Sequence, residues 1–331
     1  MNSYLILGFW QSLIELQDMY LWPILASLLI GVLAPLIGSV IVIRRLSFIA
    51  DTLSHFSLAG ITFGALLAEV LSETVLSDIS PVYMAVLFSV AGTFIIERLR
   101  GFYKNYKELS MPIVMSLGAA LTGIFIALSN GATSNMTNTL LFGSIFTVKQ
   151  KDFFIVLIMA IGIIAFAVIF YKKIIALCFD ETFARVSGIK IKALQLAITV
   201  ILAIFISITM QIFGVLLISA LMVVPVAASI LVGKSFKNTI VIAAVFSELS
   251  IMLGLYFSFI FPVPSGSLIV IINVLILIIV MIINKILQIQ KKNKTISQET
   301  INPIMKENIV LETDTSITVT TVDIENKDID E

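Results

Sequence analysis

The only histidine of this 331-residue chain, His55, lies four residues after Asp51, in an apolar stretch that runs from Asp51 to Leu71 and is interrupted only by Glu69. In a helix, an i,i+4 spacing places both side chains on one face, with Cβ atoms roughly 6 Å apart. An imidazole nitrogen and a carboxylate oxygen so arranged can ligate one divalent metal ion. Ionisable groups inside an apolar span are costly and indicate ion or substrate pathways. We therefore predict a metal site at Asp51 and His55.

A structural alternative exists for the same two residues. Asp51 lies near the start of the apolar stretch, where a carboxylate commonly caps a helix, and His55 could then hydrogen-bond a backbone carbonyl. A cap requires no histidine one turn later, so the pairing favours the metal site. Two protein ligands are fewer than the four of a structural zinc site. That shortfall suits an ion that has to leave again.

The composition is that of a membrane protein. Hydrophobic residues make up 59% of the chain and charged residues 13%, with a mean hydropathy of +1.09. A soluble protein would be about 45–50% apolar and about 25% charged. The net charge is zero, so the chain lacks the excess of positive charge that is typical of nucleic-acid-binding proteins. The single cysteine, Cys178, excludes an internal disulfide framework. These features predict an all-α polytopic membrane protein.

Apolar runs of spanning length recur along the chain. They predict about nine transmembrane helices, over residues 22–43, 51–71, 81–96, 109–129, 153–171, 193–211, 213–232, 239–259 and 267–283. Eight is the alternative, because the turn at Gln211–Gly214 leaves almost no loop between two spans. Residues 1–21 form an N-terminal segment, of which 4–16 read as an interfacial amphipathic helix. A polar loop over 130–139 precedes a short apolar piece, 140–148, that is re-entrant or interfacial.

The basic residues orient this topology. Of the 21 Lys and Arg residues, all but Lys149 and Lys151 fall on one side. The positive-inside rule makes that side cytoplasmic, with the N-terminus outside and the C-terminus inside. The transmembrane domain then covers 22–284. Residues 285–331 form a Thr- and Asp/Glu-rich tail that we predict to be disordered and cytoplasmic.

Other motifs carry weaker signals. Gly60 and Gly64 form a Gly-x-x-x-Gly pair that we interpret as helix packing. Glu248 is an acid well inside a predicted span. It could serve as a further ligand, as a gate element or as an interhelical hydrogen-bonding group. Gly233-Lys-Ser235 resembles the end of a phosphate-binding loop, but position 228 is Ala where that motif requires Gly. The sequence therefore shows no ATPase site of its own.

A different pattern occupies residues 180–188. It predicts a short amphipathic cytoplasmic helix with Phe179, Phe183 and Val186 on its apolar face and Gly188 at its end. An ordinary interfacial connector and a docking surface for a soluble partner explain this pattern equally well.

The run from Arg44 to Gly60 resembles the signature of permease subunits of zinc, manganese and iron ABC importers, which carry Arg-Arg-x-Ser, an Asp and a His four apart, and then a Gly. The resemblance covers residues 22–283. Further landmarks follow in the family's order: Leu141-Phe-Gly-Ser144, Asp180-Glu-x-x-Ala184-x-x-x-Gly188, Leu216-Leu-Ile-Ser-Ala-Leu221, Pro225-Val-Ala-Ala228 and Pro264-Ser-Gly266. The chain departs from the pattern in its long acidic tail and in Ala50, where relatives often have Gly.

This resemblance implies a multi-pass permease of the bacterial cell (inner) membrane that is not itself an enzyme. It implies a permease homodimer, two copies of a cytoplasmic ATP-binding subunit and an extracellular metal-binding protein as partners, with no permanently bound cofactor. Carried over by position, Asp51 and His55 are metal ligands. Asp180, Glu181, Ala184 and Gly188 are identified in the same way as part of the helix that couples to the ATPase.

We therefore predict a permease that moves a divalent transition metal inward by alternating access, with ATP hydrolysed by a separate subunit. Imidazole makes zinc the first choice, and manganese or iron the alternative. The rival of another class is an ion-coupled secondary metal transporter, for which few intramembrane acids remain beyond Asp51 and Glu248. A membrane sensor that binds metal without moving it is the third possibility.

Overall fold

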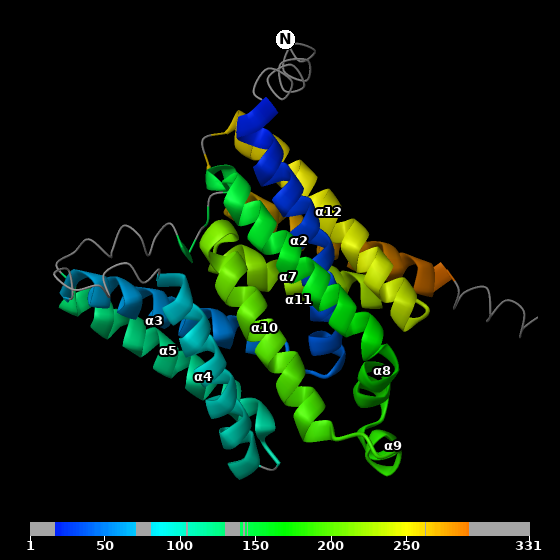
Figure 1. Ribbon diagram of the computed structural model, residues 1–331. Coiled ribbons are helices and arrows are strands. Elements are labelled where there is room, and N and C mark those ends of the chain that lie inside the picture. Colours follow the sequence, from blue (N-terminus) through cyan, green and yellow to red (C-terminus); the bar gives the residue numbers. More distant parts are fainter. Residues whose placement is uncertain are drawn as a thin grey trace, which may run out of the picture. The chain divides into compact units, whose positions relative to one another are not determined.

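The structure, a computed structural model, describes residues 17–70, 81–103, 105–129, 140–141, 143, 145–261 and 263–290. Every regular element in these ranges is a helix (Figure 1). The elements are α2 (Gln17–Ile43), α3 (Phe48–Val70), α4 (Pro81–Phe102), α5 (Ser110–Leu128), α7 (Gln150–Ile169), α8 (Tyr171–Phe179), α9 (Glu181–Val186), α10 (Ile191–Phe213), α11 (Val215–Ile230), α12 (Phe236–Ile260), a last helix Ser265–Gln290, and the short 3₁₀ turns η2 (Lys107–Leu109) and η3 (Ile145–Thr147).

Among the described residues, eight helices are long and apolar enough to cross a membrane. This confirms the predicted all-α polytopic architecture. The ninth predicted span is α11, which has 16 residues and rises about 24 Å, less than the roughly 30 Å of a bilayer's hydrocarbon core. Gly214 alone separates α10 from α11, with φ at 83°. The structure thus departs from nine full-length spans at Gln211–Gly214, the turn for which eight spans are the predicted alternative.

Helices α3, α4 and α5 pack together (Figure 1). A Cβ added to Gly60 would meet the Met84 carbonyl oxygen of α4, and one added to Gly64 would lie 3.1 Å from the Pro81 Cα. These contacts confirm that the Gly-x-x-x-Gly pair serves close helix packing. Rings of all three helices also meet: Phe63 lies 5.3 Å from Phe88 and 5.1 Å from Phe125 between ring centroids.

Helix α2 packs against α11 and α12, and α10 contacts both groups of helices. Figure 1 shows α10 crossing between α4 and α7. Small polar residues join α10 to α4, since the Ser89 hydroxyl donates to the Ala203 carbonyl and the Ser207 hydroxyl to the Ala85 carbonyl, each at 3.3 Å. Small residues of this kind allow helices to approach closely in a membrane.

The short piece over 140–148 is buried inside the protein where it is described. Ile145 is 1% exposed, and its N–H donates to the Ser265 hydroxyl at 3.3 Å. Gly143, with φ at 68°, lies against the Phe213 carbonyl at the end of α10. Irregular backbone at membrane depth is tolerated only where protein or a cavity surrounds it. The contacts agree with a re-entrant piece.

Three predicted segments lie outside the described residues: the interfacial helix over 4–16, the polar loop over 130–139 and the acidic tail beyond 290. The chain divides into two compact units, residues 1–278 and 279–331. Of the second unit, 279–290 is described and is helical. Regular helix therefore continues past the predicted domain boundary at 284.

Candidate metal site

The predicted ligands lie on the first two turns of α3. The helix begins at Phe48, which places Asp51 in its first turn and His55 one turn further on. Both side chains are half-buried. The Asp51 carboxylate lies close enough to the imidazole of His55 for a direct electrostatic interaction. Across the part of the chain that the structure describes, neither side chain makes a hydrogen bond, so their ligand atoms are available.

The capping alternative for Asp51 finds no support. Asp51 lies three residues inside α3 rather than at the residue before Phe48. No backbone N–H of the described residues donates to its carboxylate. An acid in the first turn still interacts favourably with the helix dipole. The helix dipole therefore stabilises the Asp51 carboxylate at this end of α3, although its oxygens accept no capping hydrogen bond from the described residues.

Helix α5 fixes the backbone that carries the pair. A Cβ added to Gly118 of α5 would lie 3.1 Å from the His55 carbonyl carbon and 3.0 Å from the Phe56 nitrogen. On α4, a Cβ added to Gly92 would lie 3.0 Å from the Phe56 ring. Two neighbouring helices thus contact α3 at the level of His55 and hold it in place.

Polar side chains continue around the buried side of α3. The Thr52 hydroxyl bonds to the Phe48 carbonyl at 2.8 Å and lies 3.2 Å from the Met111 carbonyl. The hydroxyls of Ser54 and Ser57 are buried and, among the described residues, have no hydrogen-bond partner. Buried polar atoms are normally satisfied, so these two oxygens are candidates for binding water or an ion. Ser57 was missed from the sequence, although it follows Ser54 at an i,i+3 spacing.

No third His, Cys, Asp or Glu joins the pair within the described residues. Glu248 of α12 lies elsewhere, with its carboxylate against Gly31 of α2. Both of its oxygens are buried and lack a hydrogen-bond partner among the described residues. Among the described residues, a metal at this pair would therefore find two candidate ligands of this kind.

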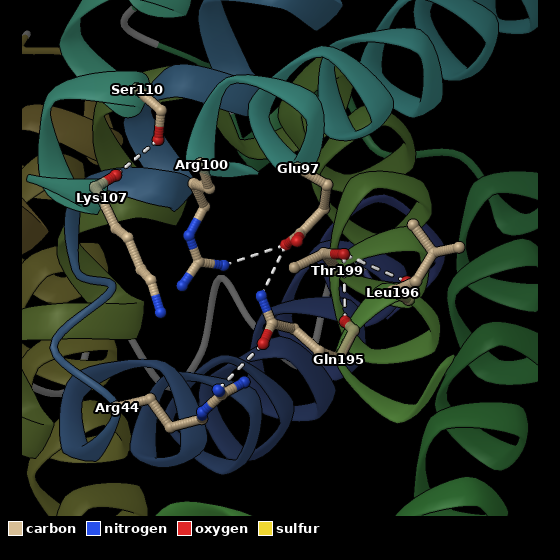
Figure 2. A network of polar contacts seen from close by, with 8 residues as sticks. All are labelled: Arg44, Glu97, Arg100, Lys107, Ser110, Gln195, Leu196 and Thr199. Atoms are coloured by element: carbon tan, nitrogen blue, oxygen red, sulfur yellow. Dashed lines mark hydrogen bonds and ion pairs between the residues drawn. The ribbon is translucent and has the colours of Figure 1, made fainter. Parts of the chain in front are cut away.

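A polar network that the sequence did not reveal links three helices (Figure 2). The Arg44 guanidinium, just after α2, donates to the Gln195 Oε1 at 3.0 Å, and the Gln195 Nε2 donates to Glu97 at 2.7 Å. Arg100 also donates to Glu97, at 2.9 Å. Burial lowers the pKa of Arg44, and the nearby positive charge of Arg100 lowers it further. Glu97 thus pairs directly with Arg100 and connects to Arg44 through Gln195, while Glu181 also offsets the charge of Arg44.

The predicted coupling residues lie in and around α9. Asp180 caps this helix, since its Oδ1 accepts from the Phe183 N–H at 2.9 Å. Glu181 pairs with Arg185 at 3.5 Å on the exposed side. Ala184 is fully buried, and Gly188 ends the turn with φ at 76°.

The structure confirms a short helix at the predicted position. Its apolar residues Phe183 and Val186 are exposed by 61% and 84%, and Phe179, at the end of α8, is exposed by 65%. The exposed surface of α9 therefore carries apolar side chains beside the Glu181–Arg185 pair. Ala184 contributes to the packing beneath this surface.

Comparison with known proteins gives consistent matches. The model of the ABC 3 transport family matches residues 17–284. The chain is 33% identical to the "Probable metal transport system membrane protein" of Treponema pallidum over 79% of this chain and 94% of that protein. It is 27% identical to the manganese transport system membrane protein MntC of Listeria monocytogenes over 77% of this chain and 87% of MntC.

A solved structure shows the same architecture. The structure described as PsaBC from Streptococcus pneumoniae in complex with Fab superimposes with a TM-score of 0.70 at 26% identity, over 83% of this chain and 95% of that chain. Eight apolar helices and these matches make this a multi-pass integral protein of the bacterial cell membrane. The family model covers most of the sequence, and the chain therefore belongs to the ABC 3 transport family.

Proposed function

We propose that this chain is the membrane-spanning subunit of an importer for divalent transition metal ions, powered by a separate ATPase. One observation carries the proposal: Asp51 and His55 adjoin on α3, half-buried and free of hydrogen bonds within the described residues. The names of the relatives agree, since they are metal transport proteins. An imidazole and a carboxylate with their ligand atoms available form an entry point for such an ion.

The ion is the finer part of the proposal, and we favour manganese. Several relatives are named as manganese transport proteins, among them MntC of Listeria monocytogenes and ScaB of Streptococcus gordonii. The imidazole of His55 had favoured zinc, which gains no support from these names. A carboxylate together with one imidazole also suits the harder manganese ion.

The proposed mechanism is alternating access around the Asp51–His55 pair. The pair supplies two ligands, and water or the Ser54 hydroxyl, three residues after Asp51 and without a partner among the described residues, supplies oxygen atoms to complete the shell. Metal binding requires a neutral imidazole, so protonation competes with the ion and uptake should weaken as the pH falls. The small number of charged ligands keeps the ion exchangeable.

Metal uptake by cells that express the assembled complex tests the site. Asp51→Ala and His55→Ala should each lower manganese uptake at least 10-fold at matched membrane expression. Glu108→Ala is the control, because Glu108 is an exposed acid outside α3. Zinc uptake measured in parallel decides between the ions. Undiminished transport of both ions in both variants would exclude the pair as the site.

The ATPase partner is proposed to dock on α9. The exposed Phe183 and Val186 offer an apolar surface on a capped, charge-flanked helix. Val186→Asp should reduce co-purification of the ATPase subunit, whereas Val232→Asp, at a 50% exposed valine after α11, should not. Equal retention of the ATPase by both variants would contradict docking at α9.

The secondary-transporter alternative is separable from this proposal. It requires metal uptake by the purified chain alone in liposomes that carry a proton or sodium gradient. We expect no uptake there until the ATPase subunit and ATP are supplied. Gradient-driven uptake without the ATPase would overturn the importer proposal.

A further inference from the structure

A basic cavity lies at the end of the α4 and α10 spans that carries Arg98 and Lys192. Its volume is about 1230 Å³, and α4, η2, α9 and the start of α10 line it. Six cationic side chains contribute to the lining: Arg98, Arg100, Lys107, Arg185, Lys190 and Lys192. Two acids, Glu97 and Glu181, are their counterparts there. The cavity is therefore strongly positive.

Both acids are already engaged. Glu97 accepts hydrogen bonds from Arg100 and Gln195, and Glu181 pairs with Arg185. The side chains of four cations, by contrast, have no ion pair or hydrogen bond within the described residues: Arg98, Lys107, Lys190 and Lys192. Figure 2 shows Lys107 extending beside Arg100 on the side of Arg44. This surplus of positive charge repels a divalent cation and attracts an anion.

The depth of the cavity indicates which anion. It lies at the end of the span Pro81–Phe102 and at the start of the span Ile191–Phe213, the level at which spans of this length leave the hydrocarbon core. Its lining includes apolar side chains beside the cations, among them Phe94, which is 53% exposed, and Phe102, which is 73% exposed. Basic pockets between spanning helices at this level bind the head groups of anionic lipids. The exposed rings give the acyl chains of such a lipid a surface to lie on.

We propose that this cavity binds the phosphate head group of an anionic phospholipid, held by Lys107, Lys190 and Arg98 with its acyl chains against Phe94 and Phe102. The site is separate from the Asp51–His55 pair and does not depend on the proposed transport function. A soluble phosphate compound would share the cationic contacts but would make no use of the apolar rim. The combination of charge and apolar surface favours the lipid.

The test measures lipid binding to the purified full-length chain by native mass spectrometry in detergent. Phosphatidylglycerol is compared with phosphatidylcholine of the same acyl chains. Lys107→Gln/Lys190→Gln should weaken phosphatidylglycerol binding roughly 30-fold, at about 1 kcal/mol per interfacial cation. The matched control, Lys172→Gln/Lys234→Gln, removes two exposed lysines that do not line the cavity and should change binding less than 3-fold.

Four outcomes would overturn the proposal. Equal binding of the two lipids, or equal losses in both double variants, would reduce the effect to general surface charge. Displacement of phosphatidylglycerol by millimolar inorganic phosphate or ATP would assign the cavity to a soluble phosphate compound. Displacement by the ATPase subunit would assign it to that partner, whereas lipid retained in the assembled complex supports the proposal. All four lysines are exposed, so the variants should fold, and an unchanged melting temperature checks this.

Discussion

Glu97→Gln should destabilise the protein, because Glu97 is the ion-pair partner of Arg100 and connects to Arg44 through Gln195. Its carboxylate accepts from Arg100 at 2.9 Å and from Gln195 at 2.7 Å, and Gln195 in turn binds Arg44. The side chains of Arg100 and Glu97 are 11% and 27% exposed. Neutralising the acid leaves Arg44, whose pKa burial and Arg100 already lower, beside an uncompensated Arg100.

Removing one partner of a buried ion pair costs about 3–5 kcal/mol. Because Glu97 keeps some access to solvent, we take the lower value of about 3 kcal/mol. Unfolding entropy of about 2.1 cal/mol/K per residue amounts to about 0.7 kcal/mol/K for a chain of this length. The expected fall in melting temperature is therefore about 4 °C.

A second substitution makes the prediction specific to charge. Arg100→Gln in the Glu97→Gln background removes the surplus guanidinium, so the double variant should recover at least half of the lost stability. Intrinsic fluorescence melts at one scan rate in one detergent measure this, since membrane proteins often unfold irreversibly. Glu108→Gln, at an exposed acid, is the control and should shift stability by less than about 0.5 kcal/mol. A Glu97→Gln melt within 1 °C of the parent, or a double variant less stable than Glu97→Gln alone, would refute the reasoning.

Two further predictions use the same purified protein. Gly118→Ala should lower the free energy of unfolding by about 1–3 kcal/mol, because its Cβ would meet the backbone of His55 and Phe56. The control, Gly123→Ala on the same helix, meets nothing within 4 Å and should be neutral or stabilising by up to about 1 kcal/mol. Equal melting temperatures of the two variants would show that α5 does not approach α3 closely. Burial raises the pKa of the Cys178 thiol from 9.0 to about 11. Because the thiolate forms only as the pH rises toward that value, alkylation by iodoacetamide at pH 8 should be roughly 100-fold slower in the native protein than in detergent-denatured protein. Equal rates in native and denatured protein at pH 8 would contradict the burial of this thiol.

Helix positions were predictable because a bilayer demands long apolar runs, which are a local property of the sequence. The exception is α11, where hydropathy continues without interruption from α10. The break depends on Gly214 adopting a φ of 83°, a left-handed conformation that glycine reaches without strain. Hydropathy contains no term for that turn. The turn at Gln211–Gly214 is nevertheless at the predicted place, with eight spans as the predicted alternative, and what hydropathy misses is that α11, at 16 residues, is short.

The same distinction separates the site residues that were predicted from those that were not. Asp51 and His55 are one turn apart, so helical geometry alone brings them together. Gln195 lies 151 residues from Arg44 and 98 from Glu97, so no local spacing relates them. In the sequence Arg44 served as a marker of sidedness. Its role in the network follows from the packing of α2, α4 and α10.

Placement and affinity are separate requirements for an ion that must be bound and then released, and under the proposed function α3 would meet them by different means. Close backbone contacts at Gly92 and Gly118 fix the helix at the level of His55, which lowers the cost of ordering the ligands. The ligand set is small, since no third His, Cys, Asp or Glu of the described residues joins the pair. Complete structural zinc sites bind with about 10–16 kcal/mol, enough to hold an ion almost indefinitely. A rigidly placed but incomplete pair instead combines a defined position with rapid exchange.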